Sequence, residues 1–206
     1  MDTKVQAVLD EYHARMKRET AMMRTLSMAE IHARRNDLLI AIGPETAQML
    51  SILIKGQGAR TIVELGASYG YSTLWFAEAA RVTGGRVISF ELDAAKVEYI
   101  RARLEQADLT AFVEFRIGDA REQLRSLDTP VDFALIDLWK DLYIPCFDLL
   151  LPRLASGAFL AADNILEPPT FREMGEAYRR HVRANGRFDS VLLPVGSGIE
   201  LSRLRD

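Results

Sequence analysis

From residue 60 onward, short apolar runs alternate with segments whose apolar residues recur every three or four positions. The runs read T-I-V-E-L (61–65), R-V-I-S-F-E-L (86–92), V-E-F-R-I (113–117), V-D-F-A-L-I-D (131–137) and A-F-L-A-A-D (158–163). Runs of this length are typical of buried strands, and the segments between them are typical of helices. The alternation therefore predicts an α/β fold, in which a parallel sheet is covered by helices on both faces.

The end of the chain follows a different pattern. The segments V-L-L-P (191–194) and I-E-L-S-R-L (199–204) flank the turn sequence V-G-S-G. Two apolar segments joined by a short glycine-containing turn are typical of an antiparallel hairpin, and not of another crossover helix. With the five runs above, we expect a doubly wound, mostly parallel sheet of seven strands that ends in an antiparallel C-terminal hairpin.

Residues 1–55 carry a helical pattern instead. Val5, Val8 and Tyr12 recur at helical spacing near the N-terminus. We expect residues 1–55 to form a helical cover over a single domain that spans 1–206, because this length suits one hydrophobic core.

Two later helices carry capping signals at their starts. Asp93 stands before a helical stripe, and Thr170 with Glu173 has the spacing of a capping box. We therefore expect Asp93 to be one N-cap and Thr170 to be another.

Charge and cysteine content exclude several classes of protein. The net charge is −3 and like charges do not form long runs, so the sequence indicates neither a nucleic-acid surface nor a polybasic membrane patch. A single cysteine, Cys146, excludes an internal disulfide and a cysteine-cluster metal site. Apolar stretches fall short of the roughly 20 residues of a membrane span, and the first residues lack the apolar core of a signal peptide. We expect a cytoplasmic, soluble protein that binds a small molecule.

A glycine-bearing loop follows the first predicted strand. It reads E-L-G-A-S-Y-G-Y-S (64–72), with Gly66 and Gly70 in it. Ser68 stands where a G-x-G-x-x-G dinucleotide motif needs its second glycine for close approach to a pyrophosphate. The loop therefore favours a ligand without phosphates, bound at the carboxyl ends of the strands, where such sheets bind ligands.

Acidic side chains end the next two strands. Glu91 is placed to accept hydrogen bonds from ribose hydroxyls, and Asp119 is placed to meet an adenine edge. A tight turn would explain any one of these features alone. Together, the three strand ends predict an adenosine-type ligand.

Further polar residues follow the fourth and fifth strands. Asp137 ends the fourth strand and Asp163-Asn164 ends the fifth, so they are expected to meet at one edge of the sheet. Taken alone, each of these residues would more often be a turn or cap residue than a metal ligand. An all-oxygen set selects a hard cation such as Mg²⁺, Mn²⁺ or Ca²⁺. Lys140 follows closely, and a nearby cation would lower the pKa of its amine, which favours a proton-accepting role.

At these motifs the chain resembles a known family. The blocks D-L-W-K-D-L-Y-I-P (137–145) and L-A-A-D-N-I (160–165) resemble the magnesium-dependent catechol O-methyltransferases, and the loop 64–72 resembles their S-adenosylmethionine loop. The similarity runs from residue 42 to the last strand. It implies a Rossmann-like methyltransferase that transfers a methyl group to a hydroxyl of a vicinal-dihydroxy, catechol-like aromatic molecule.

The resemblance also implies roles for individual residues. Asp137, Asp163 and Asn164 would bind the metal, with Asn164 also near substrate, Lys140 would be the general base, and Glu200 would hold the second substrate hydroxyl. Positions that match cofactor contacts in the family are Ile42, Glu64, Gly66, Ser72, Glu91, Ala120 and Asp137. Trp139 and Pro168 match apolar walls of the cofactor and substrate region.

Two other functions are weighed against this one. A protein that only senses S-adenosylmethionine would be expected to lack Lys140, Glu200 or a metal ligand, and all are present. A nicotinamide-dependent oxidoreductase is disfavoured by the missing middle glycine. The N-terminal helices are expected to supply either a pocket lid or a homodimer contact, and the sequence does not choose between them.

Overall fold

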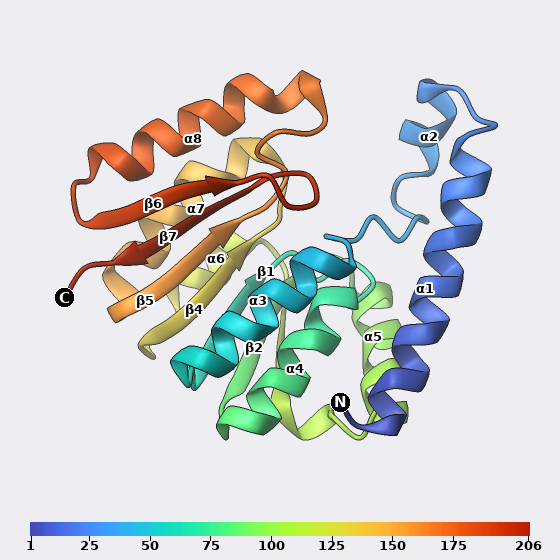
Figure 1. The fold of residues 1–206 in the computed structure, drawn as a ribbon, viewed down its shortest axis with the longest axis horizontal. Coiled ribbons are helices and arrows are strands. Elements are labelled where there is room, and N and C mark those ends of the chain that lie inside the picture. The colour runs from blue at the N-terminus through green and yellow to red at the C-terminus, as the bar shows by residue number, and fades with distance from the viewer.

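Seven strands form one sheet at the centre of the molecule. The computed structural model describes residues 1–206 except the side chains of Met28 and His32. The strands are β1 (Thr61–Leu65), β2 (Arg86–Glu91), β3 (Val113–Ile117), β4 (Val131–Ile136), β5 (Leu154–Ala162), β6 (Phe188–Leu193) and β7 (Ile199–Leu204). Their order is β3-β2-β1-β4-β5-β7-β6, and β7 runs antiparallel to both of its neighbours while the other pairs are parallel. The predicted fold class is confirmed (Figure 1).

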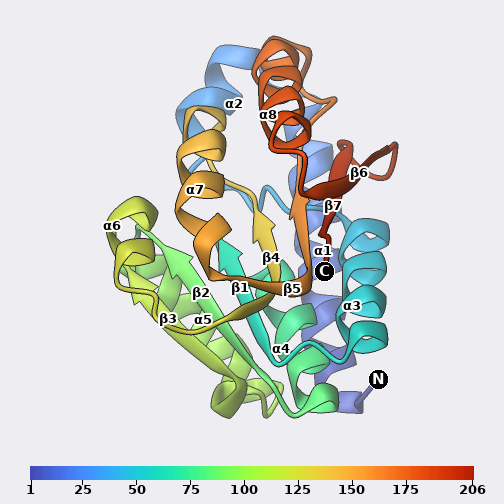
Figure 2. The same cartoon turned by 90° about the vertical axis from the view of Figure 1, so that its left-hand side faces the viewer.

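Helices cover both faces of the sheet, as Figure 2 shows. They are α1 (Thr3–Met23), α2 (Met28–Arg34), α3 (Pro44–Gln57), α4 (Tyr71–Thr83), α5 (Ala94–Gln106), α6 (Ala120–Arg125), α7 (Tyr143–Leu150) and α8 (Arg172–Ala184). Helices α6, α7 and α8 lie on one face, and α3, α4 and α5 lie on the other, with α1 packed against α4 and α5. No helix in the described part of the chain has the length and apolar character needed to cross a membrane.

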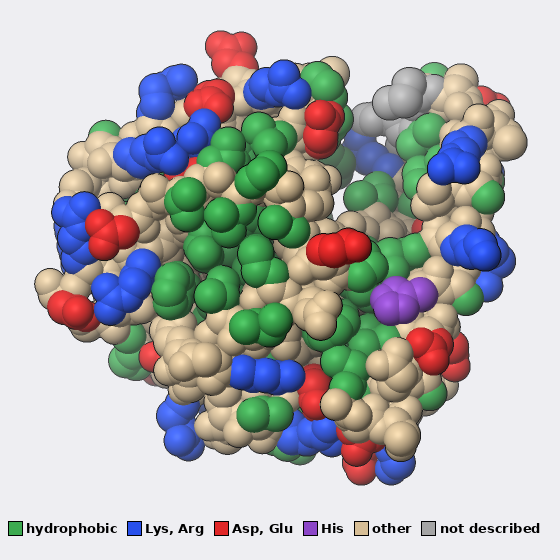
Figure 3. All heavy atoms as spheres, viewed as in Figure 1, with side chains coloured by type: hydrophobic (Ala, Val, Ile, Leu, Met, Phe, Trp, Pro, Cys, Tyr) green, Lys and Arg blue, Asp and Glu red, His purple; other side chains and the backbone are tan. Residues whose placement is uncertain are grey.

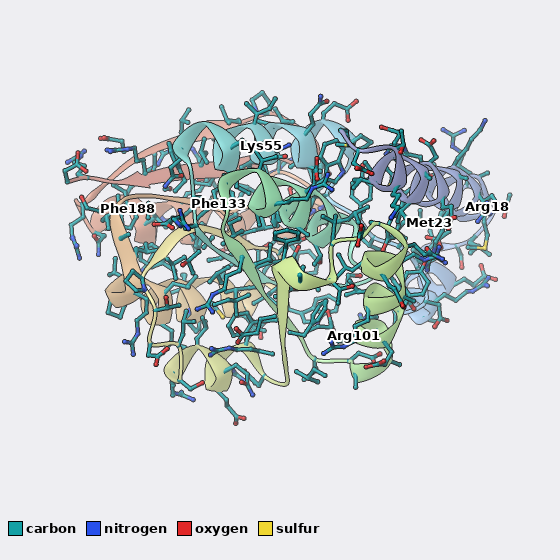
Figure 4. The ribbon with its side chains drawn as sticks, turned by 90° about the horizontal axis from the view of Figure 1, so that it is seen from below. Arg18, Met23, Lys55, Arg101, Phe133 and Phe188 are labelled. Atoms are coloured by element: carbon teal, nitrogen blue, oxygen red, sulfur yellow. The ribbon has the colours of Figure 1, made fainter. Side chains whose placement is uncertain are left out.

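The alternation of side chains along each strand divides the core into two layers. On β4, Phe133 belongs to the α4 side and Ala134 to the α7 side, and both are fully buried. Figure 4 shows Phe133 inside the molecule, with Arg18 of α1 at the periphery. The central strands are nearly continuous apolar runs because both of their faces are covered.

One of the two capping predictions is confirmed. The Asp93 carboxylate accepts a hydrogen bond from the backbone N–H of Ala95 at 2.8 Å at the start of α5. The prediction for Thr170 is wrong. Pro169–Phe171 forms a 3-10 turn, so α8 begins later, at Arg172, with Phe171 as its N-cap. Thr170 is therefore inside the turn, one position too early to cap the helix.

Candidate functional site

The carboxyl ends of β1, β4 and β5 bring the predicted polar residues to one edge of the sheet. β1 pairs with β2 on one side and with β4 on the other, so the strand order reverses at this point. In doubly wound sheets, ligands bind where the order reverses. In Figure 2 the arrowheads of β1 and β4 point toward α2.

Two carboxylates follow β4 and β5 at this edge. Asp163 is 1% exposed, and its Oδ1 atom lacks a hydrogen-bond partner among the described residues. Burial raises the pKa of Asp163, and the charge of Asp137 raises it further. Burial also raises the pKa of Asp137, against the opposing effect of the Lys140 charge. A buried carboxylate whose ionisation is disfavoured by a second carboxylate beside it is a site for a compensating cation.

The oxygen atoms at this edge fit a hard cation. Asn164 follows Asp163 directly and has a φ of 53°, a conformation that asparagine tolerates better than most residues. Across the described side chains, no group of three His, Cys, Asp or Glu residues is gathered tightly enough to hold a metal ion. A site here therefore rests on two carboxylates and an amide, which suits Mg²⁺, since Mg²⁺ commonly uses one or two carboxylates and retains water.

The Lys140 amine lies beside these carboxylates. Residues Lys140–Leu142 form a 3-10 turn after β4, and Tyr143 then begins α7. The Nζ atom of Lys140 donates hydrogen bonds to the Tyr143 hydroxyl and, at 3.0 Å, to the backbone oxygen of Asp163. Burial lowers the pKa of Lys140 to about 8, although the charges of Asp137 and Asp163 act in the opposite direction. The amine is therefore held at the site by two hydrogen bonds, and its pKa lies closer to neutral pH than that of an exposed lysine.

Gly66 places the glycine-bearing loop directly against the end of β4. Its φ is 94°, and a Cβ atom at this position would lie 2.2 Å from the backbone oxygen of Asp137. The N–H groups of Gly66 and Ala67 donate to the backbone oxygen of Phe90 at 3.0 and 3.1 Å. Ser72 is buried in the first turn of α4. A residue with a side chain at position 66 would separate the loop from the carboxylate edge.

Glu64 lies beneath this loop. It is fully buried in β1, and its Oε2 atom accepts hydrogen bonds from the hydroxyls of Thr73 and Ser89, both at 2.6 Å. Burial raises the pKa of Glu64 to about 7. The structure thus gives Glu64 internal hydrogen bonds from α4 and β2 that the sequence analysis did not predict.

Glu91 and Asp119 both receive backbone hydrogen bonds. Glu91 accepts from the N–H groups of Ser68, Leu92 and Asp93 at 2.8, 2.9 and 3.0 Å. Asp119 caps α6 and pairs with Arg121 at 2.6 Å, and the Arg121 guanidinium lowers the pKa of Asp119 to about 2.

Apolar side chains surround this end of the sheet. Leu92 and Ile117 are 73% and 42% exposed at the ends of β2 and β3, whereas Ala120 is buried at the start of α6. Two exposed apolar side chains beside the Glu91 carboxylate are available to contact a flat apolar ligand.

Trp139 directly precedes Lys140 in the segment that follows β4. It is 52% exposed, and the guanidinium carbon of Arg35 lies 4.5 Å from the centre of its ring. Pro168 is exposed in the segment that leads into α8, while Ile42 is buried in the core beside α3. Figure 3 shows the surface hollowed between this segment and the region of α2.

The structure places Glu200 differently from our expectation. Glu200 is fully buried on β7, and its Oε2 atom accepts from Arg179 at 2.9 Å while Oε1 accepts from Arg183 at 2.9 and 3.0 Å. Both carboxylate oxygens are thus engaged by α8. The sequence analysis missed these arginines, although their four-residue spacing puts them on one face of a helix.

Two other hollows lie away from these residues. One of about 590 Å³ is at the opposite end of the strands, where Ala59, Asp132 and Gly157 line it. A second, of about 450 Å³, lies between α1 and α3 and is lined by His13 and Trp75. Arg203 and Asp206 line the first hollow and pair at 3.4 Å, which leaves no unpaired buried carboxylate between them. Neither hollow contains any of the polar residues that follow β4 and β5, so we assign the site to the carboxylate edge.

Comparison with known proteins identifies the family of the chain. A family model described as O-methyltransferase matches residues 13–205. A catechol O-methyltransferase of Niastella koreensis is 32% identical over 131 residues, which cover 62% of this chain and 59% of that protein. Caffeoyl-CoA O-methyltransferase 1 of Nicotiana tabacum is 27% identical over 197 residues, 85% of this chain and 82% of that protein.

A solved structure shares the fold over the whole chain. The O-methyltransferase from Bacillus cereus, in complex with SAH, superposes with a TM-score of 0.77 at 24% identity and covers 100% of this chain and 92% of that chain. The family match and the shared fold confirm the resemblance found in the sequence. The chain therefore belongs to the O-methyltransferase family of enzymes.

Proposed function

We propose that this protein transfers a methyl group from S-adenosylmethionine to a hydroxyl of a vicinal-dihydroxy aromatic molecule, with the help of a divalent cation. The observation that carries the proposal is the meeting of Asp137, Lys140 and Asp163 at adjacent strand ends, directly beside Gly66. A methyl-donor loop, a cation site and a proton acceptor are the three parts that this reaction needs.

The cofactor would lie along the ends of β1, β2 and β3. S-adenosylmethionine supplies a methyl group on a positively charged sulfur. Glu91 would accept hydrogen bonds from the ribose, and the exposed side chains of Leu92 and Ile117 would contact the adenine. The SAH complex of the Bacillus cereus relative supports a ligand of this class.

Asp137, Asp163 and Asn164 would hold the cation. When bound, the cation would lower the pKa of a substrate hydroxyl. Its charge would also stabilise the two ionised carboxylates that burial disfavours.

The remaining steps belong to side chains of the site. Lys140 would accept the proton of the attacking hydroxyl, and its lowered pKa makes the neutral amine available near neutral pH. Trp139 and Pro168, whose side chains are both exposed, would give the aromatic ring apolar walls. A contact of Glu200 with substrate is not part of the proposal, because its oxygens are engaged by arginines.

The test is release of S-adenosylhomocysteine over a panel of vicinal-dihydroxy aromatics, with Mg²⁺ or with excess chelator. We expect turnover that the chelator removes, and we expect Asp137→Ala to lose it as well. Asp141→Asn is the matched control, because Asp141 is an exposed carboxylate in the same segment. Undiminished turnover in excess chelator would reject a role for the cation in the reaction. If S-adenosylmethionine binds but no acceptor is methylated, the result would favour a protein that only senses S-adenosylmethionine.

A further inference from the structure

A closed triangle of hydrogen bonds ties Lys140 to the end of β5. The Lys140 amine donates to the Tyr143 hydroxyl and to the backbone oxygen of Asp163, and the Tyr143 hydroxyl donates to that same oxygen at 3.0 Å. A tyrosine hydroxyl has one proton to donate and lone pairs that accept, so it can make both of its contacts at once.

Packing fixes Tyr143 in this position. It is 1% exposed, and its ring meets the ring of Tyr178 edge to face, with centroids 5.5 Å apart. The Lys140 amine also lies 3.8 Å from the centre of the Tyr143 ring. Tyr143 is therefore a rigid group against which a flexible lysine side chain can be held.

We propose that Tyr143 is a positioning residue that aims the lone pair of Lys140 at the substrate hydroxyl. A neutral amine has two N–H bonds and one lone pair. When both N–H bonds point to the Tyr143 and Asp163 oxygens, the lone pair occupies the remaining direction around the nitrogen. In the proton transfer, the substrate O–H bond breaks, a new N–H bond forms, and Lys140 becomes an ammonium group.

This inference rests on the proposed function in one respect, namely that Lys140 accepts the substrate proton. The contribution of the Tyr143 hydroxyl can be distinguished from the packing of its ring, because Tyr143→Phe keeps the ring and removes only the hydroxyl. We expect kcat to fall about tenfold, the effect of losing one hydrogen bond that aligns a reacting group. We expect KM for the acceptor and the affinity for S-adenosylhomocysteine to stay unchanged.

Tyr178→Phe is the matched control. Tyr178 is as buried as Tyr143 and touches the same ring, but its hydroxyl has no hydrogen-bond partner in the part of the chain that the structure describes. The test is completed by measuring kcat for Tyr143→Phe in a protein that also carries Lys140→Ala. There, Tyr143→Phe should change kcat by less than about twofold, because the group that it positions is absent.

A second measurement works without turnover. The five lysines are Lys4, Lys17, Lys55, Lys96 and Lys140. Peptide mass spectrometry can therefore follow the acetylation of each by acetic anhydride, with the exposed Lys4 as internal reference. We expect the acetylation rate of Lys140 to change several-fold in Tyr143→Phe, because the amine loses one of its two fixed contacts, and to stay at the wild-type rate in Tyr178→Phe.

The two measurements distinguish the possible failures. If wild type shows no methyl transfer, the proposed function fails, and the acetylation rates still test the Tyr143 contact. If methyl transfer occurs but Tyr143→Phe has a normal kcat, or lowers kcat by the same factor in wild type and in Lys140→Ala, the positioning role is rejected. Unchanged acetylation of Lys140 in Tyr143→Phe also rejects it.

Discussion

At the scale of single residues, burial lowers the pKa of Lys140 to about 8. We expect Lys140→Ala to lower kcat by about 10²-fold or more, since a positioned base contributes roughly that factor. Cofactor affinity should remain, because the amine contacts Tyr143 and Asp163 and not the glycine-bearing loop. Lys55→Ala is the control, as Lys55 lies in the last turn of α3, which leads to the start of β1, at the opposite end of the strand from the site. Near-normal turnover of Lys140→Ala, measured by cofactor product release, would remove the base assignment.

Glu64 makes a separate residue-scale prediction, about pH. Burial raises its pKa from 4.5 to about 7 in the folded protein. A raised carboxyl pKa means that the folded state binds more protons than the unfolded state between these values. The contribution of Glu64 to stability is therefore fully present below about pH 4.5 and is lost as the pH rises through about 7. The loss is on the order of 3 kcal/mol.

Glu64→Gln should flatten this dependence. The amide oxygen can still accept from Thr73 and Ser89, but the side chain does not titrate. Urea unfolding between pH 5 and pH 8 measures the difference, with Glu98→Gln, a 73% exposed carboxylate, as the control. Parallel curves for wild type and Glu64→Gln would contradict the prediction.

At the scale of elements, the contact between the β1 loop and β4 depends on a missing side chain. Gly66→Ala would bring a methyl group against the Asp137 backbone oxygen and would also strain a φ of 94°. We expect a loss of about 3 kcal/mol in the free energy of unfolding, together with weaker binding of S-adenosylhomocysteine.

Gly58→Ala is the control for backbone strain. Gly58 also has a positive φ, 70°, but a Cβ atom there would meet nothing within 4 Å among the described atoms. Its substitution should cost about 1 kcal/mol and leave ligand affinity unchanged. Calorimetric titration and denaturant unfolding measure both effects. Equal affinity in the two variants would contradict a close loop contact.

Strands were more predictable than helix starts, for a physical reason. β1 and β4 are buried on both faces, so most of their residues are apolar and the runs are visible in the sequence. The start of α8 depends on the 3-10 turn at Pro169–Phe171, which shifts the N-cap by one residue from Thr170. A capping signal indicates that a helix begins nearby, but the preceding turn decides where.

At the scale of the whole molecule, α1 is tied to the glycine-bearing loop of the same chain. The Tyr12 hydroxyl donates to the Tyr69 backbone oxygen at 2.5 Å, and the Arg15 guanidinium lies 4.2 Å from the centre of the Tyr69 ring. Arg15 also donates to the Asp37 backbone oxygen at 2.8 Å and pairs with Glu19. These contacts favour a covering role for the N-terminal helices, and a homodimer stays a prediction.

Arg15→Ala should therefore loosen two distant segments together. We expect faster hydrogen exchange in residues 36–39 and 66–70, a lower melting temperature and a weaker affinity for S-adenosylhomocysteine. Arg18→Ala, which removes an exposed guanidinium from the same helix, should change none of these. If only residues 36–39 exchange faster in Arg15→Ala, then α1 does not support the ligand loop.

The sequence by itself determined the order of strands and helices and the position of Asp137, Lys140 and Asp163 at strand ends. It could do so because buried strands require apolar runs and polar residues therefore mark where the strands end. Tertiary structure alone decided the long-range partners of the side chains around the site. Glu200 pairs with arginines 17 and 21 residues earlier in the chain, because helix packing brings α8 over β7. Tyr143 reaches the Asp163 backbone because β4 and β5 are neighbours in the sheet.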